Sequence, residues 1–427
     1  MHRDVRMKGF AERADVEEVL AFVEEQARAL SSEEVSVSAC AGRVLAGDVN
    51  SQVDVPSFSR SAMDGYAVRG EDTFGATPYD PIALRLLGES MPGAPFAGQL
   101  TSGFAVRIMT GAPLPEGADA VVMAEVSEES GERVLIRDAV APRKNVGAPG
   151  EDIRKGEQVL RAGRRLRPQD AGLLASIGAG GVACVRRPRV SLVVTGNELL
   201  PPGAQPSGAQ IVDSNSVVLA ALVARDGGVL QPHEILPDHE PRIREALCAA
   251  AGDIVLVSGG SSVGKEDHAP RLLGMLGSLD FHGVAMRPSS PAGVGRLPGL
   301  ADGGSGAVRE RLVFLLPGNP VSCLCAYEFF AGPAIRGLGG RSLRWPHSRV
   351  RLPLARKISS AIGRVDYVRV AVEEGRVVPL ATSGASILSS TVRGSGAVIV
   401  PRGCEGMPEG EAVEVLLYDE TAGVGVS

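Results

Sequence analysis

The spacing of apolar side chains changes character along the first half of the chain. Residues 15–30 carry apolar side chains at helical intervals, which predicts an amphipathic helix. Residues 51–145 are rich in Gly and Pro and contain only short apolar runs, which predicts β-strands separated by many turns. A second helix is predicted over residues 169–181, where the helical spacing runs into a group of glycines.

From residue 189 onward, β-branched apolar runs alternate with segments of helical spacing. This alternation predicts a parallel, doubly wound sheet with helices on both faces. The stretch 288–310 is rich in Gly and Pro, so we expect a loop there, mobile over residues 302–306. The predicted strands are 190–194, 229–236, 254–257 and 312–316, and the predicted helices are 214–225, 242–251, 271–276 and 321–330.

Beyond residue 340 the helical patterns stop and short apolar runs follow one another. Strands without helices between them predict a small antiparallel barrel or sandwich. We therefore expect a multidomain chain, in which an α/β domain is combined with β-rich domains. The five predicted strands are 349–354, 367–372, 377–380, 397–400 and 412–417.

Composition narrows the possible classes of protein. A chain of 427 residues is too long for one hydrophobic core, and its net charge of -6 argues against wholesale nucleic-acid binding. It contains no run of about 18 apolar residues that could cross a membrane. Residues 1–14 mix charges without an apolar run, so no signal peptide is expected. The six cysteines are scattered, which favours reduced thiols and a cytoplasmic protein.

Polar residues follow each predicted strand of the α/β domain. In a doubly wound sheet, ligands bind outside the carboxyl ends of the strands. One acid at a strand end is equally well explained as a helix cap, but three acids with two glycine turns favour a phosphorylated ligand and a divalent cation. The residues are Thr195, Gly196 and Glu198 after the first strand, Asp238 after the second, Ser258, Gly259, Gly260, Ser262 and Asp267 after the third, and Pro317, Gly318, Asn319 and Pro320 after the last.

A partial phosphate-binding motif lies in the same region. Residues 259–265 nearly match G-x-x-x-x-G-K, the loop that cradles nucleoside triphosphates. That motif requires Ser or Thr at the next position, to bind magnesium, whereas Glu266 stands there. A nucleoside-triphosphate site is therefore not favoured.

Eight blocks of sequence, in order and spread over nearly the whole chain, carry a family resemblance. Together they resemble the molybdopterin molybdenumtransferases, the family that includes the E domain of gephyrin. No single block is decisive, but their succession is highly specific. The blocks are 61–68 (SAMDGYAV), 107–122 (RIMTGAPLPEGADAVV), 150–152 (GED), 169–178, 195–199 (TGNEL), 213–215 (DSN), 258–260 (SGG) and 316–322 (LPGNPVS).

The resemblance implies a reaction and an assembly. The reaction inserts molybdate into adenylylated molybdopterin and releases AMP, with Mg²⁺ or another divalent cation as cofactor. The assembly is a homodimer in which the sheet domain of one subunit faces the segment 61–68 of the other. The molybdopterin adenylyltransferase and molybdoenzymes are implied as partner proteins. The implied domains are 10–51 with 146–187 (elongated, dimerising), 52–145 (β-rich), 188–341 (molybdopterin-binding, α/β) and 342–427 (β-barrel).

The resemblance also assigns roles to matching residues. The resemblance implies that Glu198, Asp238 and Asp267 bind the metal. For Asp64, a purely local role in its turn stays open. The implied catalytic residues are Asp64, Thr110, Asp152, Glu198, Asp238 and Asp267. The residues implied to cradle the ligand are Thr195, Gly196, Ser258, Gly259, Gly260, Ser262, Arg287, Pro317, Gly318, Asn319 and Pro320.

At three positions the charge departs from the family pattern, and a fourth, Arg287, keeps it. Arg287 and Ser290 stand where the family has the two lysines of Lys-Pro-Gly-Lys-Pro, so Arg287 keeps the charge and Ser290 does not. Gly147 replaces an arginine, and Lys265 replaces an acid. These departures support an alternative: a divergent, non-catalytic or repurposed paralogue that binds another ligand or a partner protein.

Overall fold

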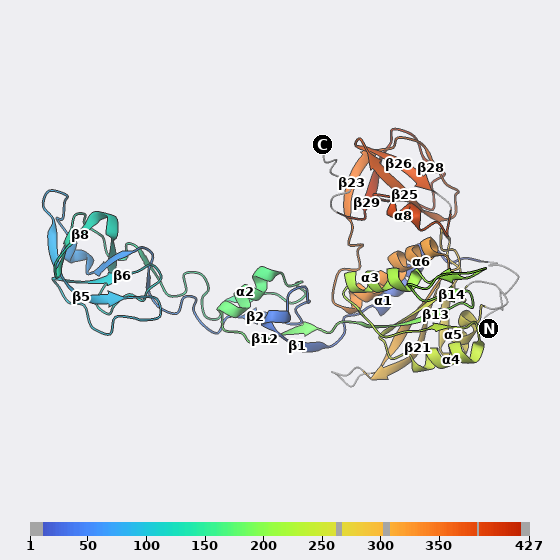
Figure 1. Cartoon of the computed structure of the whole chain (residues 1–427), viewed down its shortest axis with the longest axis horizontal. Helices are drawn as coiled ribbons and strands as arrows, with labels where there is room; N and C mark the ends of the chain where they lie inside the picture. Colours follow the sequence, from blue (N-terminus) through green and yellow to red (C-terminus); the bar gives the residue numbers. More distant parts are fainter. Residues whose placement is uncertain (1–11, 262–266, 302–307, 382–383, 420–427) are drawn as a thin grey trace. The chain divides into compact units, whose positions relative to one another are not determined.

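The computed structural model describes residues 12–261, 267–301, 308–381 and 384–419 (Figure 1). Its contacts form two compact units, Met1–Glu33 with Val185–Ser427, and Glu34–Cys184. Each unit has its own hydrophobic cores, so each is described by itself. The segment 302–306, where we predicted mobility, lies outside the described residues.

The first unit contains a seven-stranded sheet in the order β16-β13-β18-β22-β21-β19, with β17 also paired to β13. The strands from β16 to β22 run parallel, whereas β21 and β19 run antiparallel to their neighbours. The sheet is therefore mixed rather than purely parallel. Its strands are β13 (Arg189–Thr195), β16 (Val229–Leu230), β17 (Ile235–Leu236), β18 (Ile254–Ser258), β19 (Ser278–His282), β21 (Gly293–Ala301) and β22 (Val308–Leu316).

Helices cover both faces of this sheet, as Figure 1 shows for α3 and α6 on one side and α4 and α5 on the other. Strand β13 shows why both faces are covered. Val190, Leu192 and Val194 point into the hydrophobic core on one face of the sheet, and Val193 points into the core on the other face. Both faces of the strand are thus buried, which confirms the doubly wound α/β arrangement. The helices are α1 (Val16–Gln26), α3 (Asn215–Arg225), α4 (Glu240–Ala249), α5 (Ala269–Leu276), α6 (Pro320–Ala326), the π-helix η4 (Tyr327–Ala331) and α7 (Gly332–Leu338).

Strand β21 lies where a loop was predicted, so that prediction was wrong. Its glycines permit close approach of neighbouring strands rather than a turn. A Cβ on Gly295 would lie 2.1 Å from the carbonyl oxygen of Ser278 in β19. Glycine is therefore required at this position because the backbones of β21 and β19 lie so close together. The high glycine content of the segment had predicted a loop instead.

The predicted strand 229–236 is split into β16 and β17. The residues between them leave the ladder beside β13, and one of them is Pro232, which has no N–H to donate. The two first helices are also shorter than predicted. After α1, Leu30 N–H bonds to the carbonyl of Leu338 (2.9 Å) instead of continuing the helix. Helix α2 (Pro168–Ser176) ends before Gly178, whose φ of 82° is left-handed.

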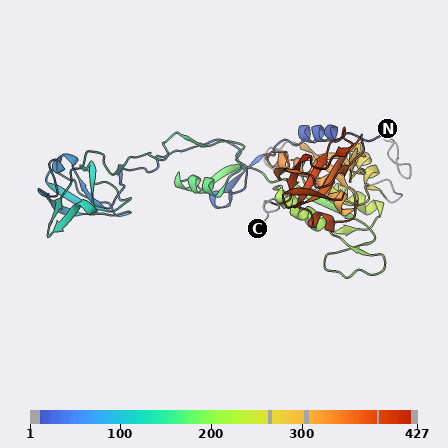
Figure 2. The same ribbon diagram turned by 90° about the horizontal axis from the view of Figure 1, so that it is seen from above.

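Helix α1 packs in the first unit, against α7 and the sheet (Figure 2). Of the predicted domain 10–51 with 146–187, residues 34–51 and 146–184 lie in the second unit, and the rest lies in the first. The four-domain division itself stays a prediction.

The C-terminal sheet of the first unit has the order β20-β25-β27-β29-β23, with β26 also paired to β25. All five predicted strands are present, but a short helix, α8 (Ser389–Val392), lies between two of them. An isolated bridge between Leu354 and Val377 joins the end of β23 to β26. The strands of this sheet are β20 (Met286–Arg287), β23 (Ser348–Pro353), β25 (Val365–Glu373), β26 (Arg376–Ala381), β27 (Gly396–Val400) and β29 (Ala412–Leu417). Two separate sheets of two short strands also belong to the first unit: β14 (Leu199–Leu200) with β15 (Ile211–Val212), and β24 (Ile358–Ser359) with β28 (Gly406–Met407).

The second unit is β-rich, as predicted. Its main sheet has the order β7-β4-β6-β5-β9-β8, and three small two-stranded sheets accompany α2. The strands are β4 (Gly65–Val68), β5 (Ile82–Ser90), β6 (Phe104–Ile108), β7 (Ala120–Met123), β8 (Ser127–Ser130), β9 (Arg133–Ile136), and the pairs β1 (Ser32–Ser36) with β12 (Gly181–Val185), β2 (Val49–Asn50) with β11 (Gln158–Leu160) and β3 (Arg60–Ser61) with β10 (Val146–Gly147). Short 3-10 turns cover Val37–Ala39, Gly70–Thr73 and Ala124–Val126. Among the described residues of both units, no helix is long and apolar enough to cross a membrane.

Candidate functional site

A cavity of about 800 Å³ opens at the carboxyl ends of the parallel strands, and we call it the strand-end cavity. Loops after β13, β17, β18 and β22 all contribute to its wall. The predicted residue Ser262 lies outside the described residues. The sequence-predicted residues in the wall are Thr195, Gly196, Glu198, Asp238, Ser258, Gly259, Gly260, Asp267, Pro317, Gly318, Asn319 and Pro320.

Two glycines shape the floor of the strand-end cavity. Gly259 has a φ of +91°, and a Cβ there would lie 2.3 Å from the carbonyl oxygen of Thr195. Gly260 has a φ of +56°, again in the left-handed region. A side chain at Gly259 would therefore be excluded by both conformation and space. The turn brings bare backbone to the cavity. The N–H of Gly259 donates to the carbonyl oxygen of Leu316 (3.3 Å), so the backbone of Gly260 is the part of the turn that can approach an anion.

The acids of the cavity differ in how firmly they are held. Asp238 and Asn197 exchange two hydrogen bonds of 3.1 Å, since each backbone N–H donates to the other side chain. This exchange ties the loop after β13 to the loop after β17. Glu198 is exposed and Asp267 is half-buried. Within the described parts of the chain, no three His, Cys, Asp or Glu side chains form a group that could hold a metal by themselves.

The wall also contains polar residues that the sequence did not single out for the site. Asp213 is 3% exposed, and its Oδ1 accepts a hydrogen bond from Ser216 N–H at the start of α3 (3.1 Å). Ser386 comes from the C-terminal sheet region and donates to Asn319 Oδ1 (2.9 Å). The residues 213–215 were recognised only as a family block and a helix cap. Nothing local in the sequence pointed to Ser386, because its contact joins residues 67 positions apart.

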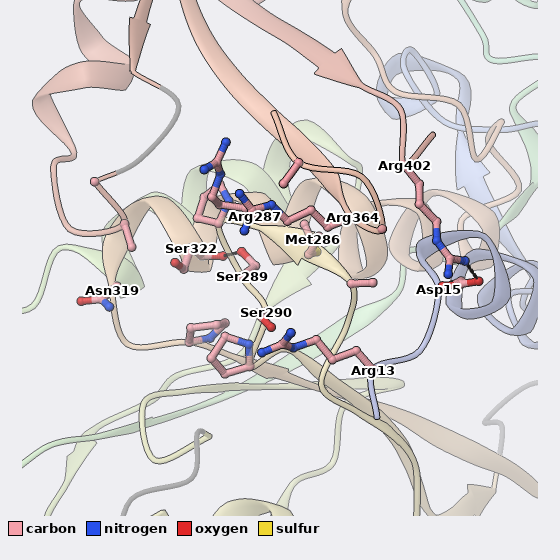
Figure 3. A pocket seen from close by; sticks show the side chains of 18 of the residues that line it. Arg13, Asp15, Met286, Arg287, Ser289, Ser290, Asn319, Ser322, Arg364 and Arg402 are labelled. Carbon is pink, nitrogen blue, oxygen red and sulfur yellow. Dashed lines mark hydrogen bonds and ion pairs between the residues drawn. The ribbon is translucent and has the colours of Figure 1, made fainter. Parts of the chain in front are cut away.

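A second cavity, of about 670 Å³, adjoins the first and shares Pro291, Pro317 and Asn319 with it. We call it the arginine cavity, because four arginines line it (Figure 3). They are Arg13, Arg287, Arg364 and Arg402.

The charges around the arginine cavity do not balance. Arg287 and Arg364 both pair with the buried Asp366, and Arg402 pairs with Asp15. Four guanidinium groups thus meet two carboxylates, which leaves two positive charges. Such an excess, beside serine hydroxyls, suits a small dianion.

The structure places Arg287 and Ser290 in a different cavity from the one that the sequence predicted for Arg287. Arg287 lines the arginine cavity rather than the strand-end cavity. Ser290, which stands where the family has a lysine, lines the same cavity, and its Oγ is buried without a hydrogen-bond partner in the structure. The lost positive charge therefore concerns the arginine cavity, which three other arginines still line.

The remaining predicted residues lie in the second unit. Asp64 Oδ1 accepts hydrogen bonds from both the N–H and the hydroxyl of Thr110, each 2.7 Å long. The backbone bond first, and then the hydroxyl, lower the pKa of the Asp64 carboxyl below its usual value. The carboxylate is thus bound to a residue 46 positions away, beyond its own turn. Asp152 is exposed, and its N–H bonds to the carbonyl of Val55 (3.1 Å).

The other two departures from the family pattern have different outcomes. Gly147 is buried, and a Cβ there would lie 2.7 Å from Glu151 Oε2, so a larger residue would have to displace that side chain. Lys265 lies outside the described residues.

Comparison with known proteins covers most of the chain. Family models match residues 14–178 (MoeA N-terminal region, domain I and II), 191–337 (probable molybdopterin binding domain) and 351–418 (MoeA C-terminal region, domain IV). The molybdopterin molybdenumtransferase of Haemophilus influenzae is 32% identical over 92% of this chain and 95% of its own length. The chain belongs to the molybdopterin molybdenumtransferase family.

Other relatives of this transferase agree. A putative molybdopterin biosynthesis protein of Methanocaldococcus jannaschii is 32% identical over 95% of this chain and 96% of its own length. The crystal structure of a molybdopterin biosynthesis MoeA protein of Pyrococcus horikoshii matches with a TM-score of 0.80 at 32% identity, covering 96% of this chain and all of that one. The predicted family is confirmed, and the chain is an enzyme. The alternative of a non-catalytic paralogue is not favoured.

Proposed function

We propose that this chain inserts molybdate into adenylylated molybdopterin and releases AMP. The observation that carries the proposal is the convergence of the Gly259–Gly260 turn with four carboxylates in the strand-end cavity. They are Glu198, Asp213, Asp238 and Asp267. Most residues of that cavity, though not Ser386 and Leu388, lie within the segment 191–337 that matches a probable molybdopterin binding domain. Curated relatives named molybdopterin molybdenumtransferase support the same reaction.

In the proposed mechanism the glycine turn holds the pyrophosphate. The backbone of Gly260 approaches the phosphate oxygens, while Asp238 is oriented by its bonds to Asn197. Cleavage of the pyrophosphate builds negative charge on the departing AMP. The contribution that the protein itself supplies is a fixed site that orients the reacting atoms.

The donor set of the strand-end cavity fits Mg²⁺. This ion usually takes one or two protein carboxylates and completes its shell with phosphate oxygens and water. Glu198, Asp238 and Asp267 line one cavity, so they can provide such ligands without forming a three-residue cluster. When bound, the ion would neutralise charge on the phosphates. We therefore propose these three acids as its ligands.

The arginine cavity is proposed to hold molybdate. Molybdate is a small dianion, and the cavity has two unbalanced positive charges and shares a wall with the strand-end cavity. Planar guanidinium groups donate to tetrahedral oxyanions through two parallel hydrogen bonds. The two substrates would thus meet at the shared residues Pro317 and Asn319.

Replacing Ser290 with lysine is expected to tighten molybdate binding about tenfold, since a charge-assisted contact contributes roughly 1.5–3 kcal/mol. The gain should shrink as salt rises. Calorimetric titration with molybdate at two salt concentrations measures both effects. Ser342→Lys, at an exposed serine outside both cavities, is the control and should change nothing. If Ser290→Lys and wild type bound molybdate with equal affinity, the proposal that molybdate binds in the arginine cavity would be contradicted.

We also propose a homodimer with a composite site, and hand-over of the substrate from the molybdopterin adenylyltransferase. The predicted catalytic residues are divided between the units, with Asp64, Thr110 and Asp152 in one and Glu198, Asp238 and Asp267 in the other. A site built from two subunits would explain this division.

Mixing Asp64→Ala subunits with Asp267→Ala subunits should therefore restore activity. Random pairing leaves one intact site in each mixed dimer, whereas each variant alone has none. AMP release by purified mixed dimers measures the recovery, and each variant dimerised with itself is the control. Mixed dimers as inactive as the controls would contradict the composite site.

A further inference from the structure

Asn215 is the first residue of helix α3 and is 9% exposed in the wall of the strand-end cavity. Its side-chain amide donates to Ser258 Oγ (3.1 Å) and to the carbonyl oxygen of Gly318 (2.8 Å). Ser258 ends β18, and Gly318 belongs to the loop after β22. One buried amide therefore joins two strand-end loops to the helix that follows a third.

The position of this amide is itself fixed. Asp213 Oδ1 accepts the N–H of Ser216, so the chain enters α3 in one defined orientation. Both amide hydrogens of Asn215 are used by the two bonds, and neither faces a ligand. The amide hydrogens of Asn215 thus act on the cavity through the groups that they hold.

The two acceptors of Asn215 determine how the loops present their own donors. Because a peptide unit is planar and trans, a Gly318 carbonyl that faces Asn215 turns the Asn319 N–H the opposite way. Ser258 Oγ accepts from Asn215, so its own hydrogen is directed elsewhere. A hydrogen bond from Ser258 acts to lower the pKa of the Cys323 thiol, although burial dominates and raises that pKa to about 12.

We infer that Asn215 is a positioning residue for substrate binding. It holds the Ser258–Gly260 turn beside the Pro317–Asn319 loop, and both segments belong to the proposed pyrophosphate cradle. Its two bonds add to the direct bonds that Gly259 N–H and Ser261 Oγ donate to the carbonyl oxygen of Leu316 (3.3 and 3.0 Å). This inference rests on the proposed function for its substrate but not for its structural claim. A cradle that is ordered before binding loses less conformational entropy when the ligand arrives.

The test compares Asn215→Ala with Ser191→Ala. Ser191 is also 9% exposed and also makes a buried hydrogen bond, accepting from Gly252 N–H (2.9 Å), but it lies outside the strand-end cavity. Asn215→Ala should raise KM for adenylylated molybdopterin about tenfold and change kcat much less, as expected for lost ground-state binding. Ser191→Ala should leave both constants unchanged, even if both variants lose similar thermal stability.

A second measurement needs no substrate. Amide hydrogen exchange at residues 258–261 and at Gly318, Asn319 and Val321 should become faster in Asn215→Ala, and not in Ser191→Ala. Unchanged exchange, or a fall in kcat with KM preserved, would overturn the positioning role. Faster exchange in a protein whose wild type transfers no molybdenum would instead overturn the proposed function and leave the positioning role standing. Asn215→Asp, which keeps the shape but removes both donors, should behave like Asn215→Ala.

Discussion

Asp238→Asn and Asp267→Asn are each expected to lower molybdenum transfer by about a hundred- to a thousandfold, the usual cost of removing one preorganised electrostatic group. Both residues follow strands at the edge of the sheet and line the strand-end cavity, away from the hydrophobic cores. Asparagine keeps their shape and removes the charge, so cation and phosphate binding should suffer while the fold persists.

AMP release and molybdenum content of the product measure the loss, and circular dichroism reports the fold. Glu409→Gln, a neutralisation at an exposed position outside both cavities, is the matched control and should retain full activity. If either variant turned over at the rate of wild type, its carboxylate would have no part in the reaction. Raising the Mg²⁺ concentration should restore part of the activity if the lost role is cation binding.

Glu328→Gln is expected to lower the free energy of unfolding by about 3–5 kcal/mol, the usual cost of breaking a buried ion pair from one side. Glu328 lies on the π-helix η4, and its side chain is 4% exposed. Arg225 donates to both of its oxygens, at 2.6 and 3.0 Å, and His347 lies 3.5 Å away. Glutamine would remove the charge and leave Asp226 as the remaining carboxylate partner of Arg225, whose side chain is 30% exposed.

Thermal unfolding checks this expectation, with a fall of about 10 °C in the midpoint. Glu245→Gln is the control, because it removes an exposed pair with Arg242, and such pairs contribute about 0–1 kcal/mol. Equal stability of the two variants would show that the buried cluster contributes nothing beyond a surface pair.

The same residue predicts a response to acid. Burial alone would raise the pKa of Glu328, but His347 and Arg225 outweigh it and lower the pKa from 4.5 to about 2. Because the folded pKa is depressed, this contribution is complete above pH 4.5 and disappears as pH falls toward 2. The stability gap between wild type and Glu328→Gln should therefore narrow across that window in denaturant titrations. A constant gap would contradict the assigned pKa.

The strand-end cavity was the part of the site most accessible from sequence. Parallel strands deliver their carboxyl ends to one edge, so identifying β13, β18 and β22 was enough to group the residues that follow them. The family blocks then extended the prediction to Asp64, Thr110 and Asp152, which no strand-end argument could reach.

The arginine cavity was not predictable in the same way. Arg364 and Arg402 are isolated charges in β-rich sequence, where arginine is ordinarily a solvated surface residue. Their meeting with Arg287 depends on contacts between distant segments, such as the shared partner Asp366. Strand β21 was missed for a related reason, because the need for Gly295 arises only from the neighbouring strand β19. The local pattern of residues in a strand does not show which other strand will lie beside it in the sheet.

Strand β20 has a consequence for how this protein could evolve or be dissected. Met286 and Arg287 pair with Val365 and Asp366, so one strand of the C-terminal sheet comes from the α/β segment that precedes it in the sequence. A gene fragment that ends near residue 341 would contain Arg287 but not its partner Asp366. The complementary fragment would leave Val365 and Asp366 in β25 without their pairing strand. Recombination could therefore not move the C-terminal sheet as an independent cassette, and any exchange between relatives would have to carry residues 286 and 287 along with it.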